Sequence, residues 1–137
     1  MAEKFLLQGN VKWSYGHELA GISRSKKILA GLVTSTPVLL RHNGYIALTT
    51  SELIIEGVEG DEDLLVPLDN VKQVYLGFDE LFPVTAEKSL GMLWQPLRIA
   101  YYLSATETQY LYLIIDYNGI YTHDKEWFNT LISLLQD

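Results

Sequence analysis

The sequence predicts a mainly β domain that ends in an α-helix. Two apolar runs meet at a polar corner within residues 44–56, two more form a hairpin within 97–115, and an amphipathic segment closes the chain. Nine Tyr, four Phe and three Trp strengthen this prediction, because aromatic and β-branched side chains pack well on a pleated surface. These observations indicate a sheet scaffold, but they indicate no reaction.

The length of 137 residues predicts a single domain, 1–137, because a second independent core would need a longer chain. The N-terminal third, 1–35, is the hardest part to assign and is either an extension or an extra strand. We expect strands at 5–11 and 28–41 around a loop that carries Arg24-Ser-Lys-Lys27. A short helix across 18–32 stays open as the alternative.

The middle of the chain carries clearer strand signals. Residues 45–48 and 53–55 are rich in strand-forming side chains and are separated by polar turn residues, which predicts a hairpin. After an acidic, glycine-containing turn, residues 64–68 predict the next strand. Pro67 indicates that this strand lies at an edge or ends there, because proline cannot donate a hydrogen bond to a neighbouring strand. The connection 79–96 has no obvious structure, and connections of this length are often functional or partly helical.

The strongest hairpin signal joins 97–103 to 110–115. A period of two places Leu97, Ile99, Tyr101 and Leu103 on one face, which we expect to be the core face. Both faces of 110–115 are fairly apolar, so we expect something else to cover the second face.

The C-terminal segment predicts a helix over about 124–136. Asp124 is of a residue type that caps helices, and Trp127, Phe128 and Leu131 begin a stripe of apolar residues at helical spacing. This stripe must pack on the sheet.

Composition narrows the classes of function. A net charge of −7 repels polyanions, so nucleic acid is not an expected partner. The chain has no cysteine, which fits a reducing compartment, and we expect a cytoplasmic protein. We find no catalytic motif and no metal-ligand spacing among the three histidines, so the sequence predicts no enzyme, metal or cofactor. A catalytic site assembled from distant strands would leave no local motif.

The order and spacing of these runs resemble the pleckstrin-homology-like (PH-like) superfamily, especially its GRAM and bacterial branches. The resemblance rests on 44–49 before 53–55, then 66–71, a late hairpin and a final helix with Glu126-Trp-Phe128. It covers roughly residues 36–136. It implies a sandwich or partly open barrel of two antiparallel sheets, with the C-terminal helix closing one end.

The first candidate site is basic. The resemblance implies that a basic loop between early strands can receive an anionic lipid head group, and the candidates are Arg24, Lys26, Lys27 and Arg41. An ordinary solvated loop is the favoured interpretation, because the net negative charge opposes anionic surfaces.

The second candidate site is aromatic. Trp94, Tyr102, Tyr110 and Tyr112 belong to the late hairpin and the connection before it, and such residues are enriched at protein interfaces. Burial of this face within the monomer is an equally weighted alternative.

Together these features predict a non-catalytic binding or assembly module that engages protein or a second copy of itself. Peripheral binding of anionic lipid is the alternative, and a small-ligand carrier or enzyme is a third class with less support.

Overall fold

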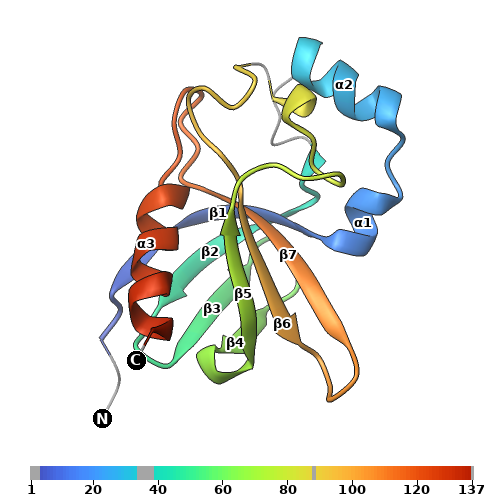
Figure 1. Cartoon of the computed structure of the whole chain (residues 1–137). Coiled ribbons are helices and arrows are strands. Elements are labelled where there is room, and N and C mark those ends of the chain that lie inside the picture. Colours follow the sequence, from blue (N-terminus) through green and yellow to red (C-terminus); the bar gives the residue numbers. More distant parts are fainter. Residues whose placement is uncertain (1–3, 34–38, 88, 137) are drawn as a thin grey trace.

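The computed structural model describes residues 4–33, 39–87 and 89–136, and the chain forms one curled antiparallel sheet of seven strands (Figure 1). The strand order is β4-β3-β2-β1-β7-β6-β5, so β4 and β5 are the two edges. The strands are β1 (Leu7–Tyr15), β2 (His42–Leu48), β3 (Glu52–Gly57), β4 (Leu64–Pro67), β5 (Val71–Leu76), β6 (Leu97–Tyr102) and β7 (Thr108–Ile115).

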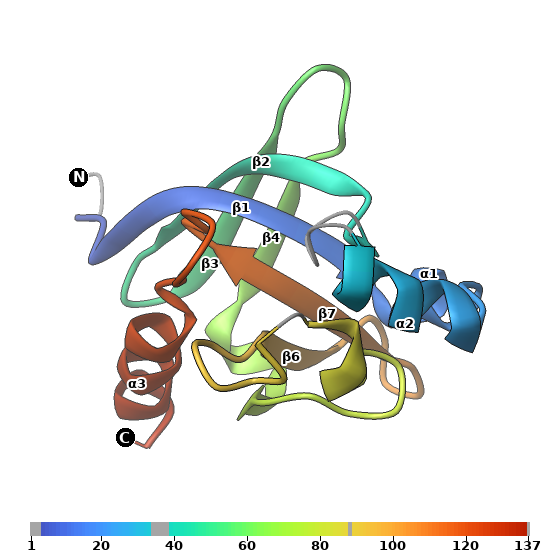
Figure 2. The same cartoon turned by 90° about the horizontal axis from the view of Figure 1, so that it is seen from above.

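Beside the sheet, the described residues include the α-helices α1, α2 and α3 and the short 3₁₀ helices η2 and η3. The helix α3 runs along one side of the sheet, whereas α1 and α2 lie on the opposite side (Figures 1 and 2). The helices are α1 (Gly16–Ala20), α2 (Arg24–Val33), η2 (Leu68–Asn70), η3 (Val84–Ala86) and α3 (Asp124–Leu135).

Pairing of β1 with both β2 and β7 joins the two halves of the sandwich into one sheet. Val11 lies opposite Gly44 on β2 and opposite Ile115 on β7. Gly44 is required where β2 meets β3, because a Cβ there would come within 2.2 Å of the Glu56 carbonyl oxygen. The sheet curls but does not close into a barrel, because its edge strands β4 and β5 do not pair with each other.

The hairpin predicted at the polar corner is confirmed. Thr49 Oγ1 accepts hydrogen bonds from the backbone N–H groups of Ser51 and Glu52, at 3.2 and 3.1 Å. The edge position indicated by Pro67 is also confirmed, since β4 is an outer strand.

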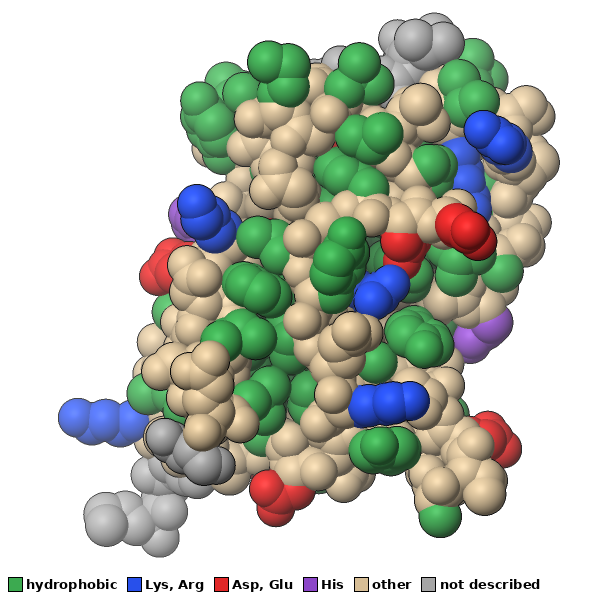
Figure 3. Space-filling model, viewed as in Figure 1, with side chains coloured by type: hydrophobic (Ala, Val, Ile, Leu, Met, Phe, Trp, Pro, Cys, Tyr) green, Lys and Arg blue, Asp and Glu red, His purple; other side chains and the backbone are tan. Residues whose placement is uncertain are grey.

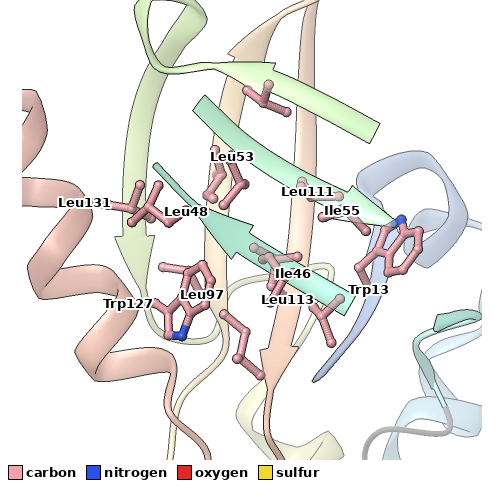
Figure 4. Packing of buried hydrophobic residues seen from close by; sticks show 14 of the residues in the cluster. Trp13, Ile46, Leu48, Leu53, Ile55, Leu97, Leu111, Leu113, Trp127 and Leu131 are labelled. Atoms are coloured by element: carbon pink, nitrogen blue, oxygen red, sulfur yellow. The ribbon is translucent and has the colours of Figure 1, made fainter. Parts of the chain in front are cut away.

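The core lies inside the sandwich, between its two halves and α3 (Figure 4). Trp13 enters it from β1, while Trp127 and Leu131 enter it from α3. The predicted core face of β6 is confirmed for three residues, but Leu103 is exposed because β6 ends at Tyr102. On β5 a bulge between Val71 and Gln73 lets both Val71 and Val74 pack against the core.

The strand predicted over 28–41 is wrong, because α2 occupies Arg24–Val33; residues 34–38 lie outside the described residues. The helical alternative over 18–32 is correct in part, since α1 and α2 are separate helices. A short apolar run does not distinguish strand from helix by periodicity. The missed signal is Ser23, whose hydroxyl accepts a hydrogen bond from the Lys26 N–H at 3.2 Å, as a helix cap does.

Asp124 does not act as the helix cap that the sequence predicts. It is the first helical residue, and its buried carboxylate accepts hydrogen bonds from the N–H groups of Leu97 and Ile115, each at 2.8 Å. The carboxylate therefore fixes α3 to β6 and β7.

Candidate functional site

The four aromatic candidates divide between the interior and the surface. Trp94 and Tyr112 are buried, whereas Tyr102 and Tyr110 are 42% and 40% exposed. The expectation that the second face of β7 is covered is therefore met over only part of the strand. The remaining part faces solvent.

The cover is a second apolar cluster formed by α1 and the connection between β5 and β6. Phe82 stacks on the Tyr112 ring, with 6.4 Å between ring centroids. Trp94 contacts the rings of Phe78 and Tyr117, at 6.0 and 5.8 Å. Trp94 and Tyr112 are thus packed inside this chain, in the second apolar cluster.

Arg98 lies between two exposed tyrosines of this face, with its own side chain only 18% exposed. Its guanidinium group lies 4.6 Å from the ring centroid of Tyr75 and 5.6 Å from that of Tyr110. It donates hydrogen bonds to Asp79 at 2.9 Å and to Gln73 at 3.0 Å. Contacts of this kind between a cation and aromatic rings are favourable and hold the arginine in one orientation.

Asp79 links this surface to the cluster beneath it. Its carboxylate accepts hydrogen bonds from the Tyr112 hydroxyl at 2.5 Å and from the Phe82 N–H at 2.9 Å, besides that from Arg98. Burial disfavours the charge, but the hydrogen bonds and the positive charge of Arg98 outweigh it and lower the pKa of Asp79. Asp79 thus stays ionised and holds Arg98 in place.

We call three exposed tyrosines of this region, together with the partly buried Arg98 among them, the tyrosine–arginine face. They point outward from β5, β6 and β7, and β5 is an unpaired edge of the sheet. Sequence reasoning missed Tyr75 and Arg98, because only the pairing of β5 with β6 places them opposite each other. The face consists of Tyr75, Arg98, Tyr102 and Tyr110.

Three of the basic candidates, Arg24, Lys26 and Lys27, lie at the start of a helix and not in a loop between strands. Arg24 and Lys26 are exposed on the first turn of α2, whereas Lys27 is only 5% exposed. Burial lowers the pKa of Lys27, although the charge of Asp79 opposes this shift. Arg41 is exposed just before β2.

These four basic residues line two different hollows. Lys26 and Arg41 share one with Glu18, and Arg41 lies 3.4 Å from the Glu18 carboxylate. Arg24 and Lys27 line the other together with Glu80. Each hollow therefore contains a carboxylate, which weakens its attraction for an anion.

A histidine that sequence reasoning did not single out joins three segments of the chain. His42 Nε2 lies 2.8 Å from Glu18 Oε2, and Nδ1 lies 2.6 Å from Asp61 Oδ1. The ring also stacks on Trp13, with centroids 5.2 Å apart. Burial of the ring opposes its charge, but the two carboxylates outweigh this effect and raise the pKa of His42. His42, Glu18 and Asp61 are far apart in the sequence, so no motif predicts that they meet.

We expect the His42 ring to titrate above its usual value of 6.5, because its charged form is held by two carboxylates. The stability contributed by this group is present in full below the unfolded pKa and is lost as the pH rises through the folded pKa. An NMR titration of the ring checks this. The double variant Glu18→Gln, Asp61→Asn should move the titration to lower pH; an unchanged titration would show that the carboxylates do not hold the proton.

Two carboxylates of the acidic loop between β3 and β4 accept backbone hydrogen bonds from β2 and β3. Asp61 accepts a hydrogen bond from the Asn43 N–H, and Asp63 accepts one from the Gly57 N–H, both at 2.9 Å. Within the described ranges there is no group of three or more His, Cys, Asp or Glu side chains that could hold a metal ion.

Solved structures share this arrangement over nearly the whole chain. The N-terminal PH domain of Vps36 aligns with 98% of this chain and 80% of its own length, at 16% identity and a TM-score of 0.51. The C-terminal domain of an unknown protein from Leishmania infantum aligns with 98% and 86%, at 12% identity and 0.56. A chain of the 8S snRNP assembly intermediate aligns with 99% and 87%, at 7% identity and 0.57. No family model and no curated protein matches the sequence.

At these identities the likeness shows the fold alone. The fold is a PH-like sandwich with a C-terminal helix, which confirms the predicted fold class in its open form. No helix in the described part of the chain is long and apolar enough to cross a membrane.

Proposed function

We propose that this chain is a non-catalytic binding module that engages another protein through the tyrosine–arginine face. The observation that carries the proposal is Arg98, held between two half-exposed tyrosines by hydrogen bonds to Asp79 and Gln73. Tyr and Arg are the residue types enriched in the energetically dominant centres of protein interfaces. The PH-like fold supports a binding role.

Two features suit this face to a protein partner. Arg98 and Tyr75 are already held by side-chain hydrogen bonds, so that binding loses little side-chain entropy at these two positions. The edge strand β5 lies beside it and presents unpaired backbone groups, to which an extended segment of a partner can add. A second copy of this chain is one possible partner of this kind.

Site-specific photo-crosslinking in cells tests the proposal. A benzophenone amino acid at Tyr102 should give crosslinked species of discrete mass, because this side chain lies within the proposed interface. The same group at Leu65, which is 54% exposed on the opposite edge strand β4, is the matched control. We expect the Tyr102 species to disappear when Tyr110→Ser is added.

Identical patterns from Tyr102 and Leu65, or species that survive Tyr110→Ser, would contradict the proposal. Light scattering over a range of concentrations then distinguishes the two kinds of partner. A species of twice the chain mass indicates self-association, whereas a concentration-independent monomer assigns the crosslinks to a different protein.

Peripheral binding of anionic lipid head groups, as in some members of the PH-like superfamily, is the alternative. The exposed Arg24 and Lys26 support it, while Glu18 and Glu80 in the two hollows oppose it. This alternative predicts binding to phosphoinositide vesicles at low salt that is lost in Arg24→Ala, Lys26→Ala.

A further inference from the structure

Two loops at one end of the molecule present apolar side chains to solvent. Met92 is 85% exposed and Leu90 is 62% exposed in the connection between β5 and β6. The loop between β7 and α3 adds Ile120 and Tyr121, each more than half exposed. The loops are joined at their bases by the contact of Trp94 with Tyr117. We call Leu90, Met92, Leu93, Ile120 and Tyr121 the apolar tip.

The first of these loops is held in a defined shape. Glu87 is buried, and its carboxylate accepts hydrogen bonds from the Gly91 N–H at 3.0 Å and from the Ser89 hydroxyl. Gln95 donates a hydrogen bond to the Gly91 carbonyl oxygen at 2.6 Å. Leu90 has a φ of 54°, which is uncommon for a residue other than glycine. A buried carboxylate and a strained backbone thus keep apolar side chains pointing into water.

The tip is uncharged in a strongly charged protein. Residues 89–97 and 117–122 contain no Asp, Glu, Lys or Arg, although the whole chain has a net charge of −7. Figure 3 shows hydrophobic side chains gathered at the upper end of the molecule, above the sheet. The first and last described residues of the chain lie at the opposite end (Figure 1). Nothing charged in these two segments opposes their transfer to an apolar medium.

The shape and size of the tip favour a membrane over a protein. A stable protein interface uses about 20 to 30 residues on each side, whereas the tip offers five on two projecting loops. Bilayer insertion needs no such complementary surface, and its affinity grows with the apolar area that is buried. Tyr side chains favour the membrane–water interface. We infer that the apolar tip inserts into the interfacial zone of a zwitterionic lipid membrane.

This mode of binding differs from the recognition of anionic head groups. Insertion depends on apolar burial, so it is insensitive to salt on phosphatidylcholine. Phosphatidylserine should not strengthen it, because the net charge of −7 is repelled by an anionic surface.

Flotation of the full chain with phosphatidylcholine vesicles tests the inference. We expect binding at millimolar lipid, and at least about a tenfold loss of affinity in the double variant Leu90→Asn, Met92→Asn, since each buried apolar side chain contributes to transfer. Asparagine tolerates a positive φ, so the variant should keep its fold. The control is Leu65→Asn, Leu103→Asn, which removes two leucines outside the tip that are 54% and 55% exposed and should bind like the wild type.

Three results would overturn the inference. The first is no binding to phosphatidylcholine at millimolar lipid. The second is binding that requires phosphatidylserine, which would indicate head-group recognition. The third is a wild-type dimer that becomes a monomer in the Leu90→Asn, Met92→Asn variant, which would make the tip a contact between copies. A thermal unfolding curve for each variant confirms that it is folded.

Discussion

Replacement of Trp127 by alanine is expected to lower the free energy of unfolding by about 3–5 kcal/mol. Trp127 is 1% exposed and is the largest side chain that α3 places in the core. Its removal takes away apolar contacts and leaves a cavity that the rigid sheet around it cannot fill. Leu131 follows one turn later on the same face, so the helix keeps only part of its attachment.

Urea unfolding followed by circular dichroism measures this effect. The control is Asn129→Ala, an exposed position on the same helix, which should change the stability by no more than about 0.5 kcal/mol. Equal stability of Trp127→Ala and the wild type would show that α3 does not contribute to the core.

Replacement of Asp124 by alanine should destabilise the protein by about 2–5 kcal/mol, because two buried N–H groups lose their acceptor. These are the N–H groups of Leu97 on β6 and of Ile115 on β7. Asp69→Asn, an exposed carboxylate of η2, is the control and should have little effect. Stability of Asp124→Ala close to that of the control would contradict the anchoring role.

Asp124 also predicts a dependence of stability on pH. Burial raises the pKa of Asp124 from 3.8 to about 7, against the opposing effect of its hydrogen bonds. The folded protein therefore holds a proton that the unfolded chain releases near pH 4, so stability from this group falls as the pH rises from about 4 to 7. Asp124→Asn cannot titrate and should flatten this part of the curve in urea unfolding. If the unfolding free energy of Asp124→Asn varied with pH as steeply as that of the wild type, the pH dependence would come from other groups.

The late hairpin was predictable because its signal is local. Side chains of a strand point alternately to opposite faces, so the alternation along 97–103 is enough to place Ile99 and Tyr101 on the same, apolar face. Both residues are buried in the core. The apolar stripe that begins at Trp127 is also a local signal, because residues at helical spacing share one face of the helix. Such a face packs against another apolar surface of the protein. The segment 24–33 was not predictable in this way, because its short apolar run suits a strand as well as a helix.

The candidate sites were less predictable than the fold. Tyr102 and Tyr110 were identified from their place on the late hairpin. Their neighbour Arg98 lies on the same face of β6 as Tyr102, but its partner Tyr75 comes from β5, whose pairing with β6 the sequence did not indicate. Tyr110 is exposed whereas Tyr112 is buried, because Phe82 packs over the Tyr112 ring. Such coverage depends on the path of the long connection, for which the sequence has no periodic signal.

The sequence by itself determined the mainly β class, the edge strand at Pro67 and the closing helix, because these depend on spacing between neighbours along the chain. Only the tertiary structure decided that Asp124 fixes that helix to the sheet, that Glu87 holds an apolar tip in water, and that Arg98 lies between two tyrosines. Each of these arrangements depends on groups that become neighbours only after the sheet curls. Burial and charge act over a few ångströms in space, at whatever separation the residues have in the sequence.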